Sequence, residues 1–123
     1  MTCPTVPRAD QACFLIIARD IADADQAAAL RDKHLDGHLA HVERHWRRYL
    51  TAGPIREPGR AGLIGSTFLV FADDAAEARA LMADDPYFTC GLYAHVEVLD
   101  QTLAIGRYLG GKIWDSAEAI RAR

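Results

Sequence analysis

The sequence contains few of the residues that stabilise small secreted proteins or span membranes. Three of its 123 residues are cysteines, and Cys3, Cys13 and Cys90 form no close pair such as C-x-x-C, so neither a disulfide framework nor a structural zinc site is expected. No apolar run approaches the ~20 residues of a membrane span. The first ten residues lack the basic start and apolar middle of a signal peptide. We therefore expect a cytoplasmic protein without membrane contact.

Positive charge is also scarce. The chain has 14 Lys and Arg against 17 Asp and Glu, which gives a net charge of −3 and a pI near 5.9. This balance creates no field that attracts phosphate backbones, so a nucleic acid is not an expected partner. Half of the 123 residues are apolar, which is enough to bury one core.

Hydrophobic patterning predicts four strands and two helices. Short apolar and β-branched runs predict strands over residues 12–18, 51–55, 64–72 and 92–99. Apolar spacings of three and four predict a helix over 24–50, kinked or divided at Gly37, whose apolar stripe centres near Val42 and Trp46. A second helix begins after Asp73 or Asp74, and Pro86 stops it at Asp85. Pro54 puts the second strand at a sheet edge or bulge.

The order strand, helix, strand, strand, helix, strand predicts an α+β fold. It is the split βαβ arrangement of a ferredoxin-like βαββαβ sandwich, with a four-stranded antiparallel sheet and two helices on one face. Along residues 92–98 apolar residues alternate with Tyr93, His95 and Glu97, so we expect these three on the face away from the helices. That face also carries apolar residues of the other strands, and we expect a second subunit to cover it.

The chain divides into three parts by composition. We expect an N-terminal extension over residues 1–11, the ferredoxin-like domain over 12–100 and a C-terminal extension over 101–123. The last part carries large apolar residues, but three glycines prevent one regular helix. We therefore expect it to pack on the domain or on the dimer interface.

Four of the five histidines share one stripe of the long helix. At about 100° per residue they fall within roughly 60°, at the border between the apolar stripe and solvent. They span ~16 Å along the axis, too far to bind one metal ion together. These histidines are His34, His38, His41 and His45. The sequence H-V-E-R-H within the stripe is not the H-E-x-x-H motif, because Glu43 points away from both of its histidines. We expect no metal site.

Acid–base chemistry is the functional interpretation of this stripe. A partly buried histidine that a carboxylate orients can transfer protons without a cofactor. Asp85 is the best carboxylate candidate, because it precedes Pro86 at a forced turn where local hydrogen bonds can hold its side chain. The alternative is that each histidine only buries one edge of its ring at the border, and that Asp85 only ends a helix.

Several segments together resemble the YCII (YciI-like) family. The segments are R-D-K-H-L at 31–35, T-A-G-P at 51–54, G-S-T at 65–67 and D-D-P-Y-F-T-C-G-L-Y-A-H-V at 84–96, in the family's order and approximate spacing. The resemblance covers about residues 13–99 and implies a dimeric α+β barrel with a site between sheet and helices. It implies His34 as the site histidine, with His38 as second choice, and Asp85 as its carboxylate. His34 lies about two residues too far from T-A-G-P, and His38 about two too near.

The same resemblance implies a small-molecule enzyme of lyase or isomerase type. The family is similar to muconolactone isomerases and includes a dehydrochlorinase-like branch, which implies proton transfer on a small ring or enol-like substrate by a His/Asp pair without a cofactor. We expect Arg31 to hold a substrate carboxylate, and Tyr93 and His95 to line a ligand site on the barrel face. One alternative is a non-catalytic small-molecule-binding or accessory module. Another is a haem- or oxygen-dependent activity with His95 or a helix histidine as ligand.

Overall fold

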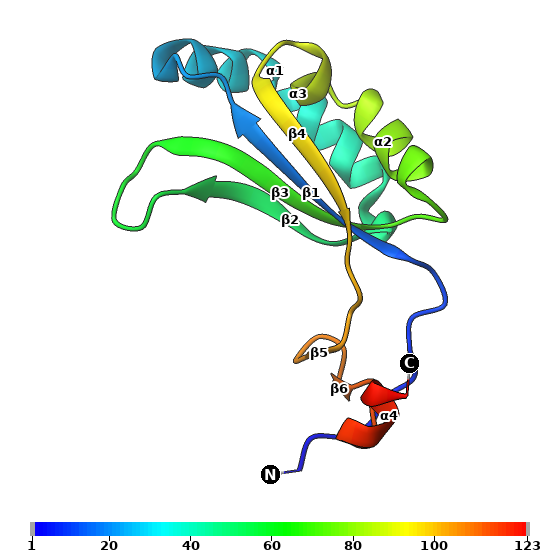
Figure 1. Ribbon diagram of the computed structural model, residues 1–123. Coiled ribbons are helices and arrows are strands. Elements are labelled where there is room, and N and C mark those ends of the chain that lie inside the picture. The colour runs from blue at the N-terminus through cyan, green and yellow to red at the C-terminus, as the bar shows by residue number, and fades with distance from the viewer. Residues whose placement is uncertain (1, 123) are drawn as a thin grey trace.

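The computed structural model describes residues 2–122 and contains one four-stranded antiparallel sheet. The strands are β1 (Cys13–Asp20), β2 (Tyr49–Arg56), β3 (Leu63–Phe71) and β4 (Tyr93–Asp100), in the spatial order β2-β3-β1-β4. Three helices, α1 (Ala24–Arg44), α2 (Ala75–Ala83) and the one-turn α3 (Pro86–Thr89), lie on one face of this sheet (Figure 1). The ferredoxin-like prediction is confirmed. β2 is an edge strand, as Pro54 predicts.

Strand register defines the two faces of the sheet. Residues directly opposite each other on antiparallel strands point to the same side. One row, Val98, Ile16, Phe68 and Ala52, faces the helices. The next row, Leu99, Leu15, Leu69 and Thr51, lies on the open face, which no helix covers (Figure 1).

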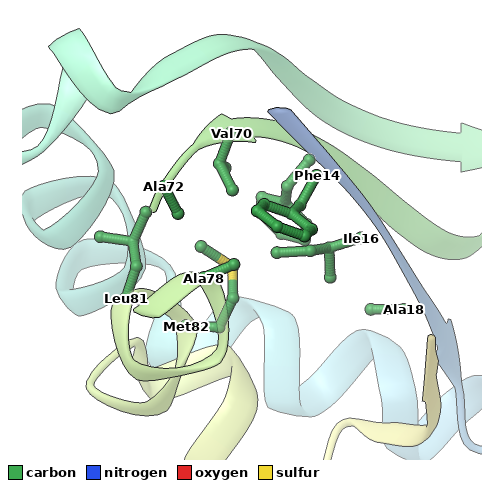
Figure 2. Packing of buried hydrophobic residues seen from close by; sticks show 9 residues of the cluster. Phe14, Ile16, Ala18, Val70, Ala72, Ala78, Leu81 and Met82 are labelled. Carbon is green, nitrogen blue, oxygen red and sulfur yellow. The ribbon is translucent and has the colours of Figure 1, made fainter. Parts of the chain in front are cut away.

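The main core lies between the central strands and α2. Figure 2 shows Phe14 and Ile16 of β1 and Val70 of β3 turned toward Leu81 and Met82 of α2. Each is at most 7% exposed. Burial of a side chain of this size stabilises the fold by about 1.5–3 kcal/mol. α2 begins as predicted at its cap, since the Asp74 carboxylate accepts a hydrogen bond from the Glu77 amide at 2.8 Å.

The long helix is shorter than predicted. It runs without division through Gly37, so the predicted division is wrong, and it ends at Arg44 instead of residue 50. A 3₁₀ turn, η1 (Trp46–Arg48), follows, and β2 then begins at Tyr49. Tyr49 pairs with Val70 and packs its ring against Phe68, so sheet pairing outweighs the helical pattern here.

The exposed side of α1 is also different from the prediction. Leu35, Leu39 and Trp46 of the apolar stripe are 42%, 44% and 62% exposed. The helix residues buried in the protein are Ala27 and His41. α1 therefore packs through the side that carries its histidines and leaves the apolar stripe beside a cleft.

A β-bulge changes the side on which Tyr93 lies. Arg19 pairs with His95, but Asp20 pairs with Tyr93, so Ala94 is an extra residue on β4. Tyr93 consequently packs into the helix side, together with Val96 and Val98. The predicted placement of Tyr93 on the open face with His95 is wrong, because simple alternation does not continue across a bulge.

The two chain extensions pair with each other beyond the sheet. The C-terminal extension forms β5 (Ile105–Gly106), β6 (Gly111–Lys112) and α4 (Ala117–Arg121). Lys112 bridges the N-terminal extension in parallel register: its amide donates to Pro4 O at 2.9 Å, and its carbonyl accepts from the Val6 amide at 2.8 Å. The two extensions lie at the same end of the molecule, away from α1, α2 and α3 (Figure 1). Among residues 2–122, no helix combines the length and apolar character needed to cross a membrane.

Candidate active site

Asp85 occupies the junction between α2 and α3. It is the N-cap of α3, and its carboxylate accepts a hydrogen bond from the Tyr87 amide at 2.9 Å. Pro86 fits the first helical position, since that position needs no amide hydrogen. The Asp85 side chain is 0% exposed. A carboxylate this deeply buried needs a further donor or a counter-charge.

His38 supplies that donor. Its Nδ1 lies 2.9 Å from both oxygens of Asp85, and its ring stacks on Tyr87 with centroids 3.9 Å apart and planes 5° from parallel. The carboxylate can only accept a hydrogen bond, so Nδ1 carries the proton. When the ring is neutral, the second ring nitrogen, Nε2, is an acceptor. His38 borders the cleft beside α1.

Gly37 lies where α1 packs against Pro86 of α3, next to the histidine that reaches Asp85. A Cβ at this position would lie 2.9 Å from Pro86 Cγ, so only glycine allows α1 and α3 to approach this closely. The approach places the next residue, His38, against Asp85. His34 lies one turn away, about 6 Å along the axis. It neither borders the cleft nor forms a hydrogen bond within the described chain, so the preference for His34 as the partner of Asp85 is wrong.

The remaining histidines have other surroundings. His41 is 3% exposed, and its Nε2 donates to the Leu81 carbonyl at 2.8 Å, which ties α1 to α2. Burial, followed by the charges of His41, Arg44 and Arg48, lowers the pKa of His45. His95 is exposed on the open face, 3.4 Å from Glu97, and so points away from the side of the sheet that carries His38 and Asp85. Within residues 2–122, no three His, Cys, Asp or Glu side chains gather as a metal site would require.

Arg31 reaches the cleft but already has a partner. Its Nη2 and Nε donate to the two carboxylate oxygens of Asp20 at 2.8 and 3.2 Å. The two side chains are 12% and 5% exposed. The guanidinium also lies over the rings of Tyr87 and Tyr93, 5.5 and 6.0 Å from their centroids. Its positive charge is therefore largely matched inside the protein.

Two buried tyrosine hydroxyls lie behind the site. Neither Tyr49 Oη nor Tyr93 Oη forms a well-formed hydrogen bond to the described residues, although Tyr93 Oη lies beside the Ser66 hydroxyl. Burial and the negative charge of Asp85 raise the pKa of Tyr49 to about 12. Burial raises the pKa of Tyr93 to about 12 as well, although the neighbouring Ser66 hydroxyl and Arg31 oppose part of that rise. Both phenols thus keep their protons at neutral pH and can donate.

The cleft lies between α1 and the β2–β3 edge of the sheet. Its volume is about 540 Å³, within the range of small-molecule sites. Its walls are mostly apolar, and its polar side chains are Arg31, Asp32, His38, Ser66 and Tyr87. The apolar wall consists mainly of Leu35, Leu39, Val42, Ala52, Pro54, Leu63 and Phe68.

The structure thus brings together Arg31, His38, Asp85 and Tyr93 of the predicted site, but not His34 or His95. Sequence reasoning missed Asp20, Gly37, Ser66 and Tyr87. Ser66 and Tyr87 lie inside the G-S-T and D-P-Y motifs, so their place in those motifs was the available signal. Nothing in the sequence marks Asp20 as the partner of Arg31.

Comparison with known proteins gives one matching family and clear relatives. The model of the YCII-related domain matches residues 12–102. The protein YciI of Escherichia coli O6:H1 is 37% identical over 92 residues, an alignment that covers 69% of this chain and 91% of that protein. An uncharacterised protein of Haemophilus influenzae is 34% identical over 91 residues, with the same two coverages.

Two solved structures share the fold. One is the 5-chloro-2-hydroxyhydroquinone dehydrochlorinase TftG of Burkholderia phenoliruptrix, in complex with 2,5-dihydroxybenzoquinone. It aligns with a TM-score of 0.64 and 24% identity over 78% of this chain and 97% of that one. The other, from Bacteroides fragilis, is a dimeric protein of unknown function with a ferredoxin-like fold. Its TM-score is 0.50, with 8% identity over 78% of this chain and 99% of that one.

Proposed function

The chain belongs to the family of YCII-related domains, and from this premise we propose that it is a small-molecule enzyme in which His38 and Asp85 transfer protons. One observation carries the proposal. A fully buried carboxylate binds Nδ1 of a histidine that borders an apolar cleft of about 540 Å³. This is the arrangement that a general base requires.

The proposed reaction begins at His38. Nε2 takes a proton from a C–H or O–H bond of the substrate, and Asp85 stabilises the imidazolium that forms. The electron pair of the broken bond stays on the substrate. It either expels a leaving group, as in a lyase, and the proton then passes from His38 to that group or to water, or it takes the proton back at another atom, as in an isomerase. Proton transfer of this kind needs only the His38 side chain and its carboxylate.

A small ring or enol is the substrate class that fits this chemistry best. Such molecules can delocalise the electron pair that deprotonation leaves behind. The solved relative TftG is a dehydrochlorinase with a bound dihydroxybenzoquinone, which supports a ring substrate and elimination chemistry. The volume of the cleft accommodates a single substituted ring.

We also propose that the chain functions as a homodimer. Leu15, Leu69 and Leu99 form an apolar row on the open face, and Leu99 is 46% exposed. Exposed rows of this kind mark interfaces. The dimeric Bacteroides fragilis protein of the same fold is consistent with this proposal. Sedimentation equilibrium is expected to give twice the mass of the 13.5 kDa chain, and a monomer at micromolar concentration would contradict the proposal.

Nitrogen-15 NMR of the histidine rings tests the pairing. At neutral pH we expect His38 to carry its proton on Nδ1, and we expect Asp85→Asn to abolish this tautomer preference because an amide can also donate. Asp84→Asn is the matched control, since it removes the neighbouring, exposed carboxylate. An unchanged His38 tautomer in Asp85→Asn would contradict the proposed pair.

Deuterium incorporation tests the chemistry. We expect the native chain in D₂O to accelerate exchange of carbon-bound hydrogen in at least one of a panel of cyclic enols and hydroxylated rings, read by mass spectrometry. His38→Asn retains a donor toward Asp85 but has no Nε2, so it should lose this activity at least a hundredfold. His34→Asn should retain it. Equal rates for the native chain and His38→Asn would contradict the proposed role of His38 in proton transfer.

A further inference from the structure

The charges around the cleft favour some substrates over others. One guanidinium, Arg31, stands against three carboxylates: Asp20 bound to it, Asp85 bound to His38, and the exposed Asp32 at the rim. Among residues 2–122, no lysine borders the cleft. A carboxylate that entered would meet a cation already paired with Asp20 and two further negative charges.

The hydrogen-bonding groups of the cleft wall lead to the same conclusion. Ser66 faces the helix side of β3, between Ala18 and Pro54 in register, and borders the cleft. The Tyr93 hydroxyl lies behind it, buried beside the Ser66 hydroxyl but without a well-formed hydrogen bond. Buried polar groups without partners are rare in native proteins and mark places where a ligand or water completes the hydrogen bonding. The Tyr93 phenol stays protonated, since burial raises its pKa to about 12.

We infer that the cleft takes a molecule with an apolar ring and no carboxylate, and that Ser66, backed by Tyr93, binds a hydroxyl or carbonyl oxygen of that ring. This inference rests on the proposed function for the presence of a substrate in the cleft. It assigns Arg31 to a positioning role, which differs from its expected role as a substrate clamp. Arg31 holds α1 against the end of β1 through Asp20 and contacts the rings of Tyr87 and Tyr93.

Binding of matched ligands to the full chain tests the inference. The probes are 4-methylphenol and 4-hydroxybenzoate, which differ by a methyl group against a carboxylate of similar shape, and toluene, which lacks the hydroxyl. Dissociation constants come from titrations followed by amide NMR. We expect 4-methylphenol to bind at least tenfold more tightly than 4-hydroxybenzoate.

Three variants separate the causes. Ser66→Ala should weaken the binding of 4-methylphenol roughly fivefold and leave the binding of toluene unchanged, because only the phenol loses a hydrogen bond. Thr67→Ala removes a hydroxyl from the opposite face of the same strand and should change neither. Asp20→Asn removes the counter-charge of Arg31, so the affinity for 4-hydroxybenzoate should rise at least fivefold.

Three results would overturn the inference. The native chain could bind 4-hydroxybenzoate more tightly than 4-methylphenol, or show no binding of 4-methylphenol up to its solubility limit. The third is that Ser66→Ala lowers the affinity for toluene and for 4-methylphenol equally. The proposed function fails separately, through the His38 tautomer and the deuterium exchange. If the chain showed the expected ligand preferences but Asp85→Asn left the His38 tautomer unchanged and no deuterium exchange occurred, the ligand inference would stand and the proposed enzymatic function would be wrong.

Discussion

Two buried carboxylates hold α1 to the rest of the protein, and they differ in one respect. Asp20, at the end of β1, binds Arg31, and Asp85, at the start of α3, binds His38. Their side chains are 5% and 0% exposed. Both contacts attach the same helix, at points about two turns apart.

The difference lies in the partner. Arg31 stays charged at every physiological pH and uses both of its contacts to Asp20 in a fixed fork. His38 can gain or lose a proton, and only one of its nitrogens is bound to Asp85. The first pair therefore suits anchoring and the second suits proton transfer. Burial and short distance alone do not distinguish an active site from a structural ion pair.

The largest expected effect comes from removing the permanent charge. Arg31→Met leaves Asp20 buried without a counter-charge and should lower the free energy of unfolding by about 3–5 kcal/mol. His38→Asn keeps an amide donor toward Asp85 and should lower it by about 1 kcal/mol. Urea denaturation measures both.

Arg48→Met provides the control for this prediction. Arg48 pairs with Glu77 at 3.3 Å, with both side chains more than one third exposed, so its loss should change stability by about 0–1 kcal/mol. If His38→Asn destabilised the protein as much as Arg31→Met, the division into an anchoring pair and a reactive pair would be wrong.

A smaller effect is expected at Gly37. In an open helix, Gly37→Ala would raise stability by about 1 kcal/mol. Here the new Cβ would lie 2.9 Å from Pro86 Cγ, so α1 must move away from α3, and we expect a net loss of about 1 kcal/mol instead. The His38 tautomer preference should weaken, because the shift separates His38 from Asp85.

Ala40→Gly calibrates the result, since it reports helix propensity at an exposed position of the same helix. If Gly37→Ala stabilised the chain by as much as Ala40→Gly destabilises it, Gly37 would have no packing role. The Arg31–Asp20 pair should be unaffected in both variants.

The fold was predictable because its signals are local. Four apolar runs and two helical patterns were enough for the topology, and Asp74 and Pro86 mark real boundaries. The fixed position of the Asp85 side chain was predictable for a related reason. A residue before a proline has few backbone conformations, and one of them lets its carboxylate cap α3.

The sequence did not show which histidine of α1 pairs with Asp85, because this pairing depends on contacts between segments that are distant in the sequence. The helical wheel gives His34 and His38 almost the same direction, and only the approach of Gly37 to Pro86 selects His38. The predicted side of Tyr93 was wrong for a similar reason, since one extra residue in β4 moves its side chain to the other face of the sheet. Neither contact leaves a mark in the periodicity of its own segment.

The pairing of the two chain ends has a consequence for folding. The Thr5 hydroxyl donates to the Trp114 carbonyl across 109 residues of sequence, close to the longest separation that this chain allows. Closing so long a loop has a large entropic cost, which falls only when β1 and β4 already lie side by side. Docking of the ends must therefore come after sheet formation. A fluorescence change at Trp114 would report the last step of folding and leave the earlier collapse unseen.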